Sequence, residues 1–246
     1  TKYPLKKINK NNNSFLTPLL SARYSPNKTK NSINYDRKIS YNEIYSLDRI
    51  GDKNIIEGGM SFTLGTEYSF NNEKNHEVFN LSVANVIRNS KNHDLPKKTT
   101  FGNKRSDIIG SLKYNPNKRF ELEYDFSLDK DISYSNYDLV KAKLSVNNFL
   151  TSFEFLEEDN IIGEKSYVKN TSKLNINKNS SMSLELRKNL DKNITDYYNL
   201  IYEYQNDCMV AAVEYNKTFY EAADLSADQN IFFTIKIVPF GEISSP

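Results

Sequence analysis

Few residues of this 246-residue chain have the types and spacing that catalysis or metal binding requires. The two histidines, His76 and His93, stand in polar stretches typical of turns, and no His/Cys cluster with metal-ligand spacing accompanies them. The acidic run Glu157-Glu158-Asp159 follows two apolar residues, and we interpret it as a solvated loop rather than a paired general acid and base. The sequence therefore predicts surface histidines, no metal site and no catalytic carboxylate pair.

Known catalytic and nucleotide-binding motifs are also missing from the chain, which contains no GxSxG, HExxH or P-loop. Glycines do occur in the stretches EGGMS (57–61) and GTEYS (65–69). These stretches resemble strands, where glycine marks a bend or close packing more often than a phosphate site. We therefore predict no catalytic residue, no enzymatic activity, no metal and no cofactor.

The only cysteine, Cys208, follows the turn-like run Gln205-Asn206-Asp207 and begins a strand-like segment. A role as catalytic nucleophile is disfavoured, because no histidine lies close in the sequence to act as its base. Two interpretations remain open. Cys208 is either a buried thiol or one half of a disulfide whose other half lies outside this chain.

Composition excludes further classes of protein. The 33 basic and 31 acidic residues are scattered along the chain, so no basic patch points to nucleic acid. No apolar run reaches the roughly 18 residues of a transmembrane helix. An apolar fraction of 38% and a mean hydropathy of -0.67 suit a soluble protein. They equally suit a β-barrel whose strands are apolar on one face only.

The hydrophobic pattern along the chain has a period of two, clearest in residues 55–70. From Ile56 to Phe70 the even positions are mostly apolar, whereas from Glu57 to Ser69 the odd positions are polar or glycine. Such alternation predicts a strand lying between two different environments. Residues 71–75 (NNEKN) then supply a turn.

Alternating segments recur along the rest of the chain, separated by turns rich in Asn, Lys and Asp such as Asn-Pro-Asn-Lys at 115–118. They predict an all-β fold with roughly ten to twelve strands, many of about ten residues, as in antiparallel outer-membrane β-barrels. Aromatic residues end several of these strands, as in the interfacial girdles of barrels. The further segments are 78–88, 108–114, 120–128, 137–146, 149–155, 167–176, 182–190, 197–204, 209–219 and 231–238.

A soluble antiparallel protein, with one sheet face on a core and the other in water, would show the same alternation. Strand length favours the membrane, because strands of soluble sandwiches are usually nearer five or six residues.

Several short phrases, taken in order, resemble the C-terminal barrel of the LptD family. These lipopolysaccharide-assembly proteins of Gram-negative outer membranes are also called organic solvent tolerance proteins. The phrases are SARYSP (21–26), LDR (47–49), EGG (57–59), GTEY (65–68), VIR (86–88), YEY followed by DC (202–208), and FFTIKIVPFGEISS (232–245). Each phrase is weak alone, and their shared order carries the resemblance.

This resemblance implies a transport function in the cell outer membrane. The family's full protein has a periplasmic jelly-roll followed by a large barrel that is plugged by a lipoprotein, LptE. Lipopolysaccharide arrives along a periplasmic bridge protein and leaves through a lateral opening between the first and last strands. Residues 1–246 would then be the C-terminal part of the barrel, without the jelly-roll and first strands. The implied partners are an LptE-like plug, the bridge protein, lipopolysaccharide and outer-membrane lipids.

The resemblance also implies roles for individual residues. On the 55–70 strand the polar side chains would face the lumen, namely Glu57, Ser61, Thr63, Glu67 and Ser69. Residues 231–238 would form the last strand beside the lateral gate, with candidates Ile231, Phe233, Ile235, Ile237 and Pro239. Because Pro239 lacks an N–H, we expect it to weaken strand pairing there.

For Cys208 the resemblance implies a disulfide, because cysteines near this place in the family bridge to the N-terminal region. The family's two adjacent cysteines are replaced here by Asp207-Cys208, which permits one bridge at most. Two other functions remain open at this stage, a general porin or transporter barrel and a soluble β-rich interaction protein.

Overall fold

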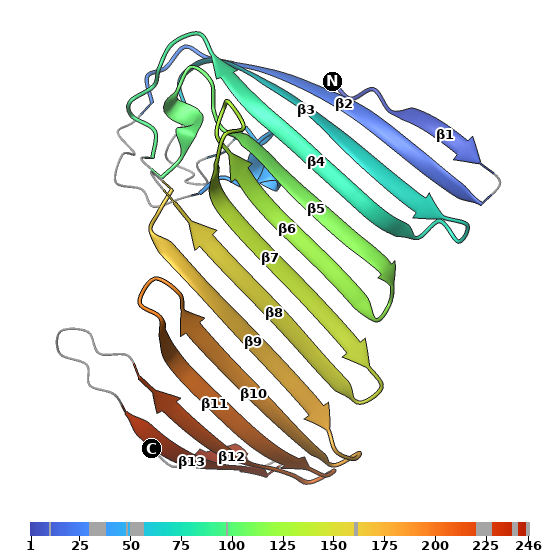
Figure 1. Cartoon of the computed structure of the whole chain (residues 1–246), viewed down its shortest axis with the longest axis vertical. Helices are drawn as coiled ribbons and strands as arrows, with labels where there is room; N and C mark the ends of the chain where they lie inside the picture. The colour runs from blue at the N-terminus through green and yellow to red at the C-terminus, as the bar shows by residue number, and fades with distance from the viewer. Residues whose placement is uncertain are drawn as a thin grey trace. The chain divides into compact units, whose positions relative to one another are not determined.

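The computed structural model describes residues 1–9, 11–29, 38–47, 49, 57–96, 98–159, 162–219, 228–237 and 241–244. Within these residues the chain is all-β, with fourteen strands that follow one another through one sheet in chain order (Figure 1). Two short 3-10 helices, η1 (Tyr41–Glu43) and η2 (Thr100–Gly102), lie in the connections. The strands are β1 Leu5–Asn9, β2 Asn12–Ser25, β3 Gly59–Asn72, β4 Glu77–Arg88, β5 Ile108–Asn117, β6 Phe120–Leu128, β7 Ser135–Val146, β8 Phe149–Glu158, β9 Lys165–Asn175, β10 Ser180–Asn189, β11 Ile194–Gln205, β12 Met209–Thr218, β13 Gln229–Ile237 and β14 Gly241–Ser244.

The prediction of an all-β antiparallel fold is confirmed, but the expected count of ten to twelve strands is too low. The period-two pattern is blurred in β2, because Phe15 and Leu19 place apolar groups on one face while Leu16 and Leu20 place them on the other. Pro18 also falls in the middle of this strand. In addition, β14 pairs with β13. The segment predicted as the last strand is therefore followed by another strand, a correction to the sequence interpretation.

Register between β3 and β4 shows why alternation makes these strands. Phe62 lies opposite Ile87 and Tyr68 opposite Leu81, all on one face. On the other face Ser61 lies opposite Arg88. The apolar side chains are exposed or half-buried, whereas Ser61 and Arg88 are buried. The polar face of this sheet is thus the covered one, the reverse of a soluble sandwich.

Short turns join the strands at one end of the sheet, and asparagine supplies their left-handed backbone. Asn75 and Asn147, in the turns after β3 and β7, have φ of 58° and 52°, a region that asparagine tolerates better than most residues. Asn193 has a φ of 51° in the turn after β10, at the other end of the strands. In the turn between β3 and β4, the Asn72 side chain also accepts hydrogen bonds from the backbone N–H groups of Lys74 and His76. Turns follow near both predicted sites, at 71–75 and 115–118, but each begins later than predicted because β3 extends to Asn72 and β5 to Asn117.

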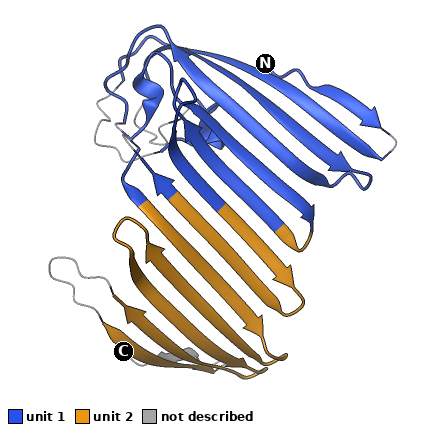
Figure 2. Cartoon of the chain, in the orientation of Figure 1, with its two compact units in different colours: residues 1–117, 121–140, 157–165 blue, residues 118–120, 141–156, 166–246 orange. Residues whose placement is uncertain are grey.

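The strands divide into two compact units (Figure 2). Unit 1 comprises residues 1–117, 121–140 and 157–165. Its long connections, which follow β2 and β4, fold onto the polar face and build a small apolar core there. This core consists of Ile39, Tyr41, Ile44, Ala84, Val86, Leu95, Phe101 and Ile109.

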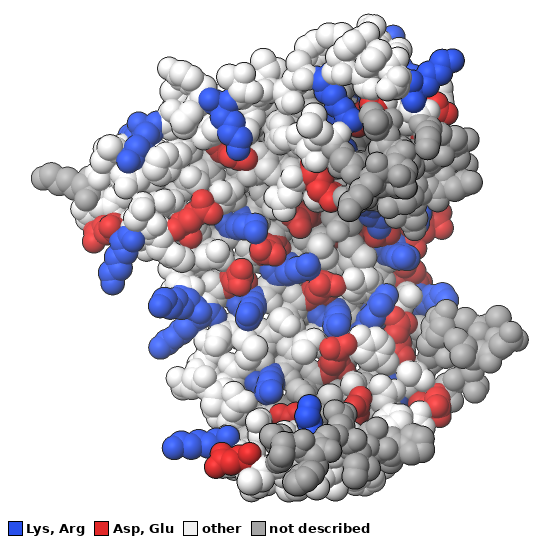
Figure 3. Space-filling view, turned by 180° about the vertical axis from the view of Figure 1, so that it is seen from behind, with Lys and Arg blue, Asp and Glu red and all other residues white. Residues whose placement is uncertain are grey.

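Unit 2 comprises residues 118–120, 141–156 and 166–246, and it has almost no apolar core. In its described part, Leu156 is the one large apolar side chain that is buried. Polar ladders cross its strands instead. The Glu185 carboxylate accepts from the Tyr197 hydroxyl at 2.7 Å and lies 2.9 Å from the Lys169 ammonium, while Arg187 lies 3.1 Å from Asp196. Figure 3 shows a face of the molecule on which such acidic and basic side chains interleave.

Candidate functional site

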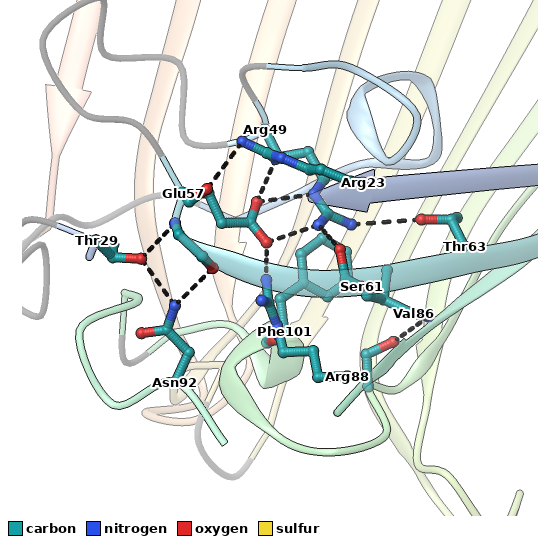
Figure 4. Close-up of polar contacts among 12 residues, drawn as sticks. Arg23, Thr29, Arg49, Glu57, Ser61, Thr63, Val86, Arg88, Asn92 and Phe101 are labelled. Atoms are coloured by element: carbon teal, nitrogen blue, oxygen red, sulfur yellow. Dashed lines mark hydrogen bonds and ion pairs between the residues drawn. The ribbon is translucent and has the colours of Figure 1, made fainter. Parts of the chain in front are cut away.

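Three arginines from separate parts of unit 1 converge on the carboxylate of Glu57 (Figure 4). Arg23 Nη1 lies 2.6 Å from Glu57 Oε2. Arg49 binds both carboxylate oxygens of Glu57, with its Nη2 2.6 Å from Oε1 and its Nε 2.9 Å from Oε2. Arg88 Nη2 also contacts Oε1. Except for Arg23, at 14%, each of these side chains is at most 3% exposed.

The sheet register brings this cluster together at the end of the strands that bears the long connections. Arg23 on β2 lies opposite Ser61 on β3, which lies opposite Arg88 on β4. Glu57 comes just before β3, so its carboxylate meets both strand-borne arginines. Arg49 comes from the connection between β2 and β3 and covers them.

Arg49 is held by more than its ion pair. Its Nη2 donates to Ser61 Oγ at 3.0 Å and its Nη1 to Thr63 Oγ1 at 3.5 Å, while its guanidinium lies 5.5 Å from the centre of the Phe101 ring. Burial lowers the Arg49 pKa to about 10, so the side chain stays charged at neutral pH. Arg88 Nε donates to the backbone carbonyl of Phe101.

One carboxylate shared by three guanidiniums leaves these four side chains with a formal charge of +2. Buried charges are expensive, and removing one partner of such a group costs far more than the group contributes in net stability. We therefore regard the arginine cluster (Arg23, Arg49, Glu57 and Arg88) as a structural clamp that is also rich in positive charge.

The η1 segment lies on the same polar face as this cluster. The Tyr41 hydroxyl donates to Glu67 Oε1 at 2.9 Å, and burial together with this bond raises the Tyr41 pKa, so the hydroxyl stays a donor. Ile44 is 1% exposed beneath it. Gly65 allows the segment to approach, because a Cβ there would collide with the Tyr45 hydroxyl. The interpretation of this strand glycine as a close-packing residue is thus confirmed.

A cleft of about 580 Å³ lies beside the cluster, between the connections that follow β2 and β4. Hydrogen bonds tie its two walls together: the Asn92 side-chain amide and the Gly58 backbone N–H both donate to Thr29 Oγ1, at 2.8 and 2.7 Å (Figure 4). Arg88, Lys28 and Lys91 are among the residues that line the cleft.

The acidic run at 157–159 is only partly the solvated loop that we expected, because Glu157 and Asp159 are exposed but Glu158 is buried. Glu157 and Glu158 end β8, and the Glu158 side chain is 4% exposed and paired with Lys38. The reason is that the connection after β2 reaches across to it, a long-range contact that the local sequence gives no sign of. Both histidines are exposed, as predicted, and no group of His, Cys, Asp and Glu suited to a metal occurs in the described part of the chain.

A family model described as "LptD: LPS transport system D" matches residues 2–171, which is more than two thirds of the chain. The chain belongs to the LptD family. Membership makes it a transport protein rather than an enzyme and indicates the outer membrane. It also disfavours the soluble interaction protein. Among the described residues, no helix is both long and apolar enough to cross a membrane.

Other comparisons add little to this LptD-family assignment. No curated protein matches the chain. Among solved structures, a triple mutant of the Rhodopseudomonas blastica porin is similar, with 8% identity, 95% of this chain and 83% of the porin covered, and a TM-score of 0.41. A likeness this weak carries no argument.

Three of the residues predicted to face the lumen are buried at the arginine cluster. Glu57 is a member of the cluster, and Ser61 and Thr63 accept hydrogen bonds from Arg49. Glu67 and Ser69 lie farther along the same face of β3 and are half-buried. That this face lines a lumen stays a prediction.

The remaining predicted site residues lie elsewhere. Ile231, Phe233, Ile235 and Ile237 share one exposed face of β13, whereas Pro239 lies outside the described residues. Cys208 is exposed in the connection between β11 and β12, so the buried-thiol interpretation is wrong.

Sequence reasoning missed the three arginines as partners of Glu57. A signal was present, because Arg23, Arg49 and Arg88 each belong to one of the phrases that carried the family resemblance. A recurring arginine in separate phrases, together with one buried-face glutamate, could have suggested a shared ion cluster.

Proposed function

We propose that this chain forms part of the barrel wall of an outer-membrane translocon that inserts lipopolysaccharide into the outer leaflet. The observation that carries the proposal is the match to the LptD family over residues 2–171. A generic porin, the second candidate, has no comparable support. In this view the periplasmic jelly-roll and the first barrel strands belong to the rest of the polypeptide.

The two faces of the strands suit this cargo. Lipopolysaccharide combines a charged sugar head with acyl tails, so its path needs a wet polar lumen beside an apolar exterior. Acidic and basic side chains interleave on the polar face, so water and counter-charges would be present all along the route. A patch of one charge, which would hold the sugar head too tightly, is avoided. Exposed apolar side chains on the opposite face suit contact with lipid.

Lateral release and partners follow from the same proposal. The exposed apolar face of β13 would lie toward lipid beside the exit, and an LptE-like lipoprotein would contact the polar face. The bridge protein would deliver cargo through the N-terminal domain. Transport energy would come from elsewhere in the pathway, since the sequence carries no nucleotide-binding motif.

Controlled depletion of the full-length protein tests the proposal. We expect newly made lipopolysaccharide to be absent from the cell surface after depletion, measured by surface labelling, and to return when the gene is restored. Normal surface display after depletion, together with a steady single-channel conductance of the purified protein, would instead establish the porin alternative.

We also propose that Cys208 forms a disulfide with a cysteine in the N-terminal region. Its exposed position between β11 and β12 makes it accessible to such a partner. The mature full-length protein should resist alkylation of Cys208 until it is reduced. Free alkylation without reductant would refute the disulfide.

A further inference from the structure

The cleft beside the arginine cluster has the features of a built anion site. Arg88 lies in its lining, and its side chain is 2% exposed. Its Nε donates to the Phe101 carbonyl and its Nη2 meets Glu57. No hydrogen bond or ion pair joins its Nη1 to any residue that the structure describes, and its buried Nη2 has no partner there besides the ion pair with Glu57. A buried guanidinium with an unfilled donor beside an open cleft calls for an acceptor from outside the chain.

Charges around the cleft reinforce that requirement. Lys28 and Lys91 line it from the two tethered walls, and His93 lies beside them. Among the lining residues that the structure describes, Asp94 is the one carboxylate, so Arg88, Lys28, Lys91 and Asp94 together carry a formal charge of +2. Arginine offers a fork of donors and lysine a mobile point charge, a combination suited to the oxygens of a phosphate.

The mouth of the cleft adds an apolar component. Tyr24 and Met60, which also line it, pair across β2 and β3 on the outward apolar face and are 74% and 42% exposed. A ligand that places a phosphate on Arg88 could therefore lay a hydrocarbon tail against this face. Free phosphate would use only half of the site.

We propose that this cleft binds the phosphate group of an anionic amphiphile at the outer rim of the barrel wall. Its location at the outer rim rests on the proposed function, because the long connections of outer-membrane barrels are extracellular and the short turns periplasmic. Lipopolysaccharide and glycerophospholipids share the required chemistry, and the experiment below separates them.

The test uses the purified full-length protein in detergent at low salt. Four probes are compared: the lipid anchor of lipopolysaccharide with its phosphates, the same anchor after enzymatic dephosphorylation, phosphatidylglycerol, and inorganic phosphate. The cleft variant is Lys28→Gln/Lys91→Gln. These exposed side chains stand outside the arginine cluster, so the variant should fold. The matched control is Lys7→Gln/Lys74→Gln, two exposed lysines at the short-turn end of the strands.

We expect the phosphorylated anchor to bind wild type and control equally and the cleft variant roughly tenfold more weakly, which corresponds to about 1.4 kcal/mol. The dephosphorylated anchor should bind weakly to all three. Lysine-dependent binding of phosphatidylglycerol that is tighter than binding of the phosphorylated anchor would support the site and assign it to membrane phospholipid. Equal binding of the phosphorylated anchor to both lysine variants would overturn the proposal, as would inorganic phosphate binding as tightly as the amphiphiles.

Failure of this inference is distinguishable from failure of the proposed function. Surface display of lipopolysaccharide after depletion reports on transport alone, whereas the binding measurement needs no transport. A lysine-dependent phosphate site in a protein whose depletion leaves display intact would uphold the cleft and refute the translocon.

Discussion

At the scale of single residues, one carboxylate organises the end of the sheet in unit 1. Glu57 holds together two strand-borne arginines and one from a connection, all in a setting with little water. Its removal does more than delete three ion pairs, because it leaves guanidiniums buried without their counter-charge.

Glu57→Gln in the full-length protein should therefore lower the free energy of unfolding by about 3–5 kcal/mol. Glu67→Gln, on the same strand face, keeps an amide oxygen that can accept from Tyr41 and loses only the charge of that bond, so it should cost at most about 1 kcal/mol. Heat-modifiability on gels, or urea unfolding in detergent, measures both. Equal losses in the two variants would show that the cluster has no special role.

Asp107 gives a pH-dependent prediction. This carboxyl precedes β5, accepts from Ser127 and Asn136, and has its pKa raised mainly by burial. With the folded pKa above the unfolded one, the folded state binds more protons, so stability falls as pH rises through the folded pKa. Asp107→Asn should remove that part of the decline and unfold at a higher temperature at neutral pH. An unchanged pH profile of the unfolding midpoint contradicts this.

At the scale of elements, the strands could be predicted and the connections could not. Strand alternation is a local pattern, so the sequence alone shows that neighbours such as Phe62 and Ser61 lie on opposite faces of the strand. The core on the polar face is assembled from Ile44, Leu95 and Phe101, which lie in connections without any period. For the same reason the arginine cluster, which depends on register between three strands and a connection, was outside the reach of local pattern.

The packing of the η1 segment predicts a barrier function for it. Ile44→Asp would bury a charge in the small core and should expel the segment from the polar face. Leu47→Asp is the matched control, since Leu47 is 84% exposed in the same connection. If the polar face lines the lumen, cells with Ile44→Asp should become severalfold more sensitive to a large antibiotic, and cells with Leu47→Asp should not. Equal sensitivity argues against a barrier.

At the scale of the whole chain, apolar side chains are mostly on the outside. Leu20, Leu64, Phe153, Leu184 and Phe233 are all exposed, and far more large apolar side chains are exposed than buried in the described residues. Exposure of such a large apolar surface to water would strongly destabilise a water-soluble chain. The stability of this fold must come from a surrounding apolar phase together with hydrogen bonding between successive strands.

Refolding of the urea-denatured full-length protein tests this dependence. Dilution into phospholipid vesicles or detergent micelles should give a strand-rich circular dichroism spectrum and resistance to protease. Dilution into buffer alone should give aggregation. A monomeric, protease-resistant protein in plain buffer would contradict the lipid requirement.

The position of Cys208 turns an isolated thiol into an orientation reporter. It sits between β11 and β12, and the connection to β13 leaves the opposite end of β12. Because the strands from β9 to β14 pair antiparallel in chain order, the side of the membrane on which Cys208 lies determines the direction of each of them. A membrane-impermeant maleimide, applied to reduced intact cells and then to opened ones, would read that direction from the labelling that Cys208→Ser abolishes.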